Sequence, residues 1–140
     1  MSGGTPVTGS GAVNRRRQPG RGAAVVDFVL VGALLSLIFV GLVQLAVVLH
    51  VRNTLIDCAA DAARYGALAD RTPADGVARA RTLITQDLSD GYARDVHAGR
   101  EQVAGLDTVV IRVRAPLPLV GLLGVGRVLE VSGHAVQERP

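Results

Sequence analysis

The sequence predicts an α+β protein in which a single N-terminal transmembrane helix continues into an extracytoplasmic helix, followed by a second helix and a small antiparallel β-hairpin or sheet. Three observations lead to this prediction: a long uncharged apolar run, small residues at helical spacing beyond it, and two C-terminal segments that alternate apolar and polar residues. The expected division is a basic cytoplasmic leader at 1–22, a transmembrane helix at 23–51, a helix extension at 52–69 and a small extracytoplasmic α+β domain at 70–140.

The apolar run extends from Phe28 to Leu49, 22 residues without a formal charge. At about 1.5 Å per residue it covers about 33 Å, slightly more than the hydrocarbon thickness of a bilayer, which is about 30 Å. A cleaved secretory signal peptide is the alternative, but its apolar region is usually about 7 to 15 residues long, and no suitable small-x-small site follows this run. A membrane-spanning helix is therefore the preferred interpretation.

The basic residues of the N-terminal arm predict the orientation of this helix. Four arginines precede the run, whereas Arg52 alone lies immediately beyond it and acidic residues come next. Because cytoplasmic flanks carry the excess of basic residues, we expect a cytoplasmic N-terminus and an extracytoplasmic position for everything after His50. The topology-setting residues are Arg15, Arg16, Arg17 and Arg21.

Composition argues against several functional classes. The net charge of +3 is smaller than the four positive charges of the arm, so the remainder of the chain is not basic. Two Tyr, two Phe and no Trp offer few stacking platforms for single-stranded nucleic acid. The single cysteine excludes an intramolecular disulfide, and His50, His97 and His134 are too scattered to suggest zinc. We therefore expect no nucleic acid, no small-molecule substrate, no metal or other cofactor and no enzymatic activity.

Asp27 places a carboxylate at the start of the apolar run. An acid at the centre of a spanning helix costs about 2.5 to 3.5 kcal/mol and less near the interface, so it calls for a partner. Lipid headgroups and Arg21 of the same chain are two alternatives. If the chain is cut after Gly22, Ala23 carries a new positive α-amino group, and the carboxylate of the fifth mature residue can neutralise that amine on an adjacent subunit.

The stretch RGAAVVDFVLVGALL, a basic leader ending in glycine followed by an acid and Phe at the fifth and sixth positions, resembles the processing site of type IV pilin-like proteins. More particularly, it is similar to the TadE-like minor pseudopilins of the tight-adherence (Flp-type) pilus system. The resemblance continues in RNTLIDCAADAARYGAL and, more loosely, in VSGHAVQER near the C-terminus. The family usually has Glu where this chain has Asp27, so the carboxylate is shorter by one methylene.

This resemblance implies cleavage between Gly22 and Ala23 by a membrane prepilin peptidase, and subunit recognition through Asp27 and Phe28. It implies a minor pseudopilin or assembly component of a tight-adherence pilus or related secretion system, with other pilin or pseudopilin subunits as partners. The chain would be a single-pass protein of the cytoplasmic membrane, incorporated in a surface pilus or assisting its assembly. The alternative is an uncleaved membrane-tethered binding or structural domain unrelated to pili.

Small residues continue the helical pattern beyond the membrane. A stripe recurs at helical spacing and predicts a helix to about Ala69, with Cys58 as a small apolar member or, alternatively, an intermolecular disulfide partner. The stripe suits close packing against either the chain's own domain or another subunit. On the opposite face, Asp61 and Arg64 are expected to form an i,i+3 pair. The stripe residues are Leu55, Ala59, Ala62, Gly66 and Ala69.

A second helix is predicted from Pro73 to about Ser89. Thr72 is the expected N-cap and Asp75, three residues later, completes a capping box. The apolar face of this helix consists of Val77, Ala80, Leu83, Ile84 and Leu88. Residues 90–105 are polar and weakly patterned, which predicts mostly loop with at most a short irregular strand.

Two alternating segments near the C-terminus predict an antiparallel pair of strands. In DTVVIRVRA (107–115) Val109, Ile111, Val113 and Ala115 are expected to face inward, and in GRVLEVSGHAVQE (126–138) the inward residues are Leu129, Val131, Gly133 and Ala135. Arg112 or Arg114 is expected near Glu130 across the sheet. The connection PLPLVGLLGVG (116–126) is apolar for a loop and is expected on the membrane, on a partner or buried within its own hairpin.

Overall fold

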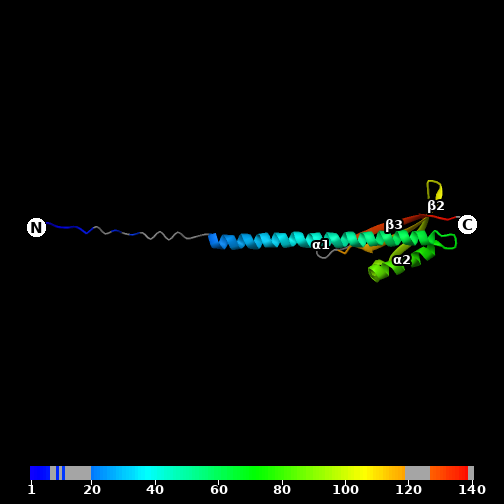
Figure 1. Ribbon diagram of the computed structural model, residues 1–140, viewed down its shortest axis with the longest axis horizontal. Helices are drawn as coiled ribbons and strands as arrows, with labels where there is room; N and C mark the ends of the chain where they lie inside the picture. The colour runs from blue at the N-terminus through cyan, green and yellow to red at the C-terminus, as the bar shows by residue number, and fades with distance from the viewer. Residues whose placement is uncertain (7–8, 10, 12–19, 119–126, 139–140) are drawn as a thin grey trace. The chain divides into compact units, whose positions relative to one another are not determined.

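The computed structural model describes residues 1–6, 9, 11, 20–118 and 127–138 (Figure 1). Its elements in chain order are α1 (Gly20–Gly66), α2 (Pro73–Asp87), the short 3-10 helix η1 (Asp90–Tyr92), β1 (Asp95–Val103), β2 (Leu106–Pro116) and β3 (Val128–Val136). One long apolar helix, a second helix and a three-stranded antiparallel sheet confirm the α+β class. The chain divides into two compact units, Met1–Ile38 and Phe39–Pro140.

The first part of α1 exposes its apolar side chains. Every residue from Gly20 to Val43 is exposed. Within the described part of the chain, α1 is the one helix long and apolar enough to cross a membrane. Exposed Leu, Val, Ile and Phe side chains over such a length are stable in lipid rather than in water, so this helix indicates single-pass membrane anchoring.

The later part of α1 is buried on one side by α2 and the sheet. Its buried residues are Val51, Leu55, Cys58, Ala59, Ala62, Ala63 and Gly66. The stripe of small residues therefore packs against the chain's own domain, which was one of the two predicted alternatives. The prediction was wrong at its end, since α1 stops at Gly66 and Ala69 is exposed. The chain reverses there through turns closed by Ala67 N donating to Ala63 O and Arg71 N donating to Leu68 O.

The start of α2 confirms the predicted capping box. Thr72 Oγ1 accepts a hydrogen bond from Asp75 N at 3.3 Å, and Thr72 N donates to Asp75 Oδ2 at 2.8 Å. The helix ends at Asp87, slightly before the predicted Ser89. At Gly76 the two helices approach so closely that a Cβ atom would lie 2.8 Å from Ala62 O. Glycine is therefore required at this crossing.

The sheet has the order β1-β2-β3, and both pairs of strands are antiparallel. The predicted pairing of β2 with β3 is confirmed, with Val109, Ile111 and Val113 fully buried and Arg112 and Arg114 exposed. Arg114 lies opposite Glu130, and its Nε donates to Glu130 Oε2 at 2.9 Å. This contact confirms the prediction that Arg112 or Arg114 lies near Glu130.

Strand β1 corrects the prediction that residues 90–105 are mostly loop. Nine residues, DVHAGREQV, pair along their whole length with β2. The segment lies at the sheet edge, so only Val96 is buried and the sequence lacks an apolar alternation. A two-residue turn at Ala104 (φ 51) and Gly105 (φ 78) joins β1 to β2. Both φ angles are positive, as a tight hairpin turn requires, but the dipeptide Ala-Gly is not a strong sequence signal for such a turn.

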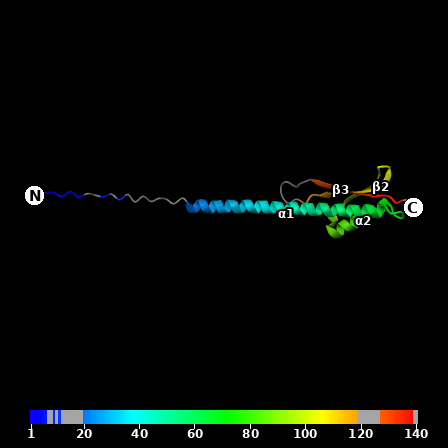
Figure 2. The same cartoon turned by 45° about the horizontal axis from the view of Figure 1, so that its top comes forward.

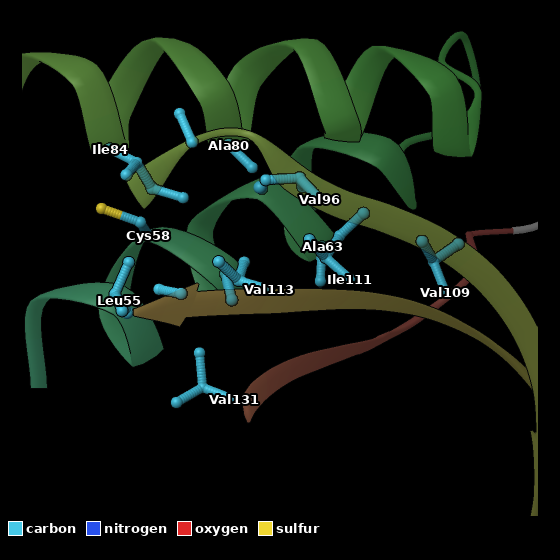
Figure 3. Packing of buried hydrophobic residues seen from close by; sticks show 14 of the residues in the cluster. Leu55, Cys58, Ala63, Ala80, Ile84, Val96, Val109, Ile111, Val113 and Val131 are labelled. Atoms are coloured by element: carbon cyan, nitrogen blue, oxygen red, sulfur yellow. The ribbon is translucent and has the colours of Figure 1, made fainter. Parts of the chain in front are cut away.

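Both helices cover the same face of the sheet, and the core lies between them and β2 (Figure 3). Gly133 of β3 packs directly on α1, where a Cβ atom would lie 2.3 Å from the carbonyl carbon and oxygen of Ala59. Glu138 N donates to Ala67 O at 2.9 Å and so attaches the chain after β3 to the end of α1. The fully buried side chains include Leu55, Ile84, Val96, Val109, Ile111 and Val113.

Candidate functional site

The residues that the sequence singled out for processing and assembly lie at the start of α1. Gly22, Ala23, Asp27 and Phe28 are all exposed, and Phe28 retains 80% of its accessible surface. Arg21 is exposed on the first turn of the same helix. Arg15, Arg16 and Arg17 lie outside the described residues.

Helical geometry places Ala23 and Asp27 on one face. They are four residues apart in α1, so their side chains are neighbours one turn apart. No ion pair joins Asp27 to Arg21, which was one of the alternative partners, and none reaches Asp27 from any other described residue. The carboxylate is thus available to a group outside the described part of the chain, and a new amine at Ala23 would lie one turn away from it.

The peptide bond between Gly22 and Ala23 is inside the first turn of α1, which begins at Gly20. Peptidases bind their substrates in an extended conformation, so this turn must unwind before the bond can be cut. Gly20 and Gly22 make unwinding easier, since each glycine weakens a helix by about 1 kcal/mol relative to alanine. The turn also contains no acidic residue to stabilise the positive end of the helix dipole.

An open groove of about 530 Å³ lies between α1 and α2. Arg79 Nε donates to Asp61 Oδ2 at 3.1 Å across it. This contact corrects the predicted pair of Asp61 with Arg64: α2 runs back along α1 and brings a better placed guanidinium to the carboxylate. The lining residues are His50, Thr54, Asp57, Cys58, Asp61, Arg79, Leu83 and Asp87.

Cys58 lies at the inner wall of this groove and is only 4% exposed. Its Sγ donates to Asp87 Oδ2 at 3.7 Å. Burial, and then the negative charge of Asp87, raise the pKa of the thiol to about 11. The thiol is therefore protonated at neutral pH and a poor nucleophile. Cys58 thus occupies the position of a small core residue.

The groove residues Arg79 and Asp87 were not identified from the sequence. A signal existed, because Arg79, Leu83 and Asp87 recur every four residues and so share one face of α2. That spacing shows that the three residues share one face of α2, but it does not show that this face contacts α1. Within the described residues, no group of three or more His, Cys, Asp or Glu side chains is placed to hold a metal ion.

An exposed apolar helix followed by a compact α+β unit defines a class of protein, the single-pass membrane-anchored domain. Residues 22–64 match the family model described as TadE-like protein, which confirms the resemblance to the TadE-like family. The matched segment lies entirely within α1 and begins at Gly22, whereas α2 and the sheet fall outside it. No curated protein and no solved structure gives a significant match.

Proposed function

We propose that this chain is a minor pseudopilin or assembly component of a tight-adherence pilus, with a leader that is removed after Gly22. The observation that carries the proposal is the coincidence of the TadE-like match with α1, whose first turns expose Gly22, Ala23, Asp27 and Phe28. The role is structural and non-enzymatic. The partners are a prepilin peptidase and other pilin or pseudopilin subunits.

In the proposed topology the basic arm stays in the cytoplasm, α1 crosses the cytoplasmic membrane once, and the α+β domain is extracytoplasmic. The peptidase unwinds the first turn of α1 and cuts before Ala23, which removes the four positive charges of the arm and creates one α-amine. The amine of one subunit then meets Asp27 of its neighbour, where the low dielectric strengthens their attraction. Exposed apolar side chains from Phe28 onward pack between the helices of adjacent subunits.

The alternative function is an uncleaved membrane-tethered domain. The helical conformation of Gly20–Ala23 favours it, because a peptide bond inside a helix is protected from cleavage. The two functions differ in the N-terminal residue of the mature chain.

The decisive experiment is mass spectrometry of the N-terminal peptide from membranes of hosts with and without prepilin peptidase. A peptide that starts at Ala23 only when the peptidase is present supports the pseudopilin. Gly22→Val should abolish that peptide, because a branched side chain obstructs the extended substrate, whereas Gly32→Val within the apolar run is the matched control and should leave it unchanged. An intact arginine arm in both hosts contradicts the proposal and leaves the tethered domain.

Asp27→Ala should leave membrane insertion intact or improved, because it removes a charge from the start of the apolar run. It should weaken association with partner pilins, measured by co-purification after mild crosslinking. Asp27→Glu restores the carboxylate and should retain association. Unchanged co-purification of the partners with the alanine variant would count against the pairing of Asp27 with a neighbouring amine.

A further inference from the structure

One end of the second unit carries a shallow hollow of about 360 Å³, at the place where β2 ends and β3 begins. Its lining includes Arg94, Leu117, Arg127 and Val128. Leu117 N donates to Arg127 O at 3.2 Å and holds the two chain segments together. These four residues are called the basal surface below.

The direction of β3 shows which end of the unit this is. Gly133 packs on Ala59, and further along, Glu138 N donates to Ala67 O, so β3 and α1 run in the same direction. Figures 1 and 2 show β3 beside the later part of α1. The start of β3 therefore lies toward the earlier, apolar residues of α1.

The level reached by the basal surface follows from these two contacts. Gly133 lies on Ala59 and Glu138, five residues later, on Ala67, eight residues later in the helix. Val128 precedes Gly133 by five residues and therefore lies roughly level with Val51, within one helical turn of Leu49. The uncharged run of α1 ends at Leu49.

Burial along α1 agrees with this level. Gln44 and Val48 are half-buried although their neighbours are exposed, and Val51 is buried. These residues share one face of the helix. Since the covered face begins within the last two turns of the apolar run, the part of the domain packed on α1 reaches the depth at which lipid headgroups surround the helix.

The chemistry of the basal surface suits that environment. Arg94 and Arg127 are exposed, and neither forms an ion pair with a described residue. Arg114 in the same hollow pairs with Glu130, and Asp95, the acidic residue of the lining, contacts His97 at 2.6 Å instead of either free arginine. Beside them the side chain of Val128 is 62% exposed. Guanidinium groups bind phosphates through paired N–H donors, and arginines flanking exposed apolar side chains are typical of surfaces that lie in the membrane interface.

We propose that the basal surface rests on the bilayer that α1 crosses. Arg94 and Arg127 bind phosphates of anionic lipids, and Leu117 and Val128 enter the layer just below the headgroups. Lipid is the occupant because α1 is continuous through Leu49 and Val51 and therefore holds this surface at the bilayer. Residues 119–126 lie outside the described residues and are not part of the proposed surface. The proposal holds for either leaflet and does not depend on cleavage or on pilus assembly.

The test compares the two ends of β3 in the full chain. Val128→Cys and Val136→Cys place a thiol at the start and the end of the same strand, on the same face, at sites with 62% and 53% exposure. Cys58 stays in place, because its buried, protonated thiol does not react at pH 7, and labelling of the unsubstituted chain checks this. Each variant receives an environment-sensitive fluorophore and is reconstituted in phosphatidylcholine vesicles with or without phosphatidylglycerol, containing lipids with a headgroup quencher.

The label at position 128 should be quenched several-fold more strongly than the label at position 136, and phosphatidylglycerol should increase the difference. Equal quenching at the two positions overturns the proposal. Replacing Arg94 and Arg127 with Gln should reduce quenching at position 128 in the anionic vesicles. Arg64→Gln, an exposed arginine near the far end of α1, is the control and should leave it unchanged. Quenching at 128 that is insensitive to the Arg94 and Arg127 substitutions overturns their role in lipid binding.

Discussion

The two halves of α1 differ in what covers them. From Phe28 to Leu49 the helix presents mainly large aliphatic side chains, none of which is buried and of which only Val48 is half-buried. Between Val51 and Gly66 the side chains that α2 and the sheet bury are mainly small. Large side chains suit lipid, where they gain contact with acyl chains on every side. Small residues suit a protein surface that must approach another backbone closely, as Ala59 approaches Gly133. One continuous helix is thus adapted to two solvents, lipid and protein interior.

The exposed side of the later half carries charges, such as Arg52 and Arg64, but its buried side is as apolar as the first half. Side-chain volume therefore separates this buried side from a lipid-facing one, because Ala59, Ala62 and Gly66 leave space that only a close backbone can fill.

Gly133→Val should have the largest effect, because its Cβ atom would lie 2.3 Å from the backbone of Ala59 and neither backbone can move without disrupting α1 or β3. We expect a loss of more than about 4 kcal/mol in the free energy of unfolding, enough to prevent the domain from docking on α1. Gly99→Ala in β1 is the matched control, since its nearest contact would be Arg112 Nη1 at 3.5 Å. Denaturant unfolding of the detergent-solubilised protein, followed by circular dichroism, provides the measurement. A stable Gly133→Val variant would contradict the close contact.

Leu55→Ala should cost about 3 kcal/mol, because it leaves a cavity under a fully buried side chain. Leu45→Ala removes the same atoms from a residue of α1 that is 54% exposed, so it should leave the stability of the domain unchanged. The pair tests the contrast directly, since both residues lie on one helix. Comparable losses in the same unfolding measurement would mean that the packing of α2 and the sheet does not distinguish the two halves of α1.

Thr72→Ala removes the capping box at the chain reversal that brings α2 back onto α1, and should cost about 1 kcal/mol. The hydrogen bonds from Thr72 also lower the pKa of Asp75, so the substitution should raise that pKa toward its ordinary value. Thr82→Ala is the control, because Thr82 only donates to Ala78 O on the exposed side of α2. Thermal unfolding and NMR titration of Asp75 measure the two effects, and equal changes for both variants would contradict the role of the cap.

Cys58 should make the free energy of unfolding depend on pH only in the alkaline range. Because its folded pKa is raised from 9.0 to about 11, the folded state retains the thiol proton, and this contribution is complete below pH 9 and is lost as the pH rises toward 11. At pH 8 the folded thiol should also react about 100-fold more slowly with iodoacetamide than an unfolded one, since the thiolate fraction falls tenfold per unit of pKa. Cys58→Ala should lose the stability change between pH 9 and 11. A native labelling rate equal to the unfolded rate would contradict the burial of this thiol.

Several features were accessible from local sequence alone. The apolar run identified the exposed part of α1, Thr72 and Asp75 identified the start of α2, and the alternation of 107–115 and 126–138 identified the inward residues of β2 and β3. Each of these features depends on residues within one or two turns of helix or on neighbouring positions of a strand. The residues that form the pattern are therefore the same residues that determine the structure. The positions of Ala23, Asp27 and Phe28 on a helix were accessible in the same way, whereas Gly22 was assigned to the leader and lies within α1, which begins at Gly20.

Other features depended on where the chain reversals place distant residues. Strand β1 forms because β2 supplies a ladder of backbone partners, although its own sequence contains little apolar alternation. Asp61 pairs with Arg79 rather than Arg64 because α2 returns along α1. The sequence predicted an α+β protein and the faces of its elements, since periodicity is a local property. Which faces meet, and the level at which Arg94 and Arg127 lie along α1, follow from contacts between residues far apart in the chain, and these contacts depend on backbone approaches such as Gly133 on Ala59.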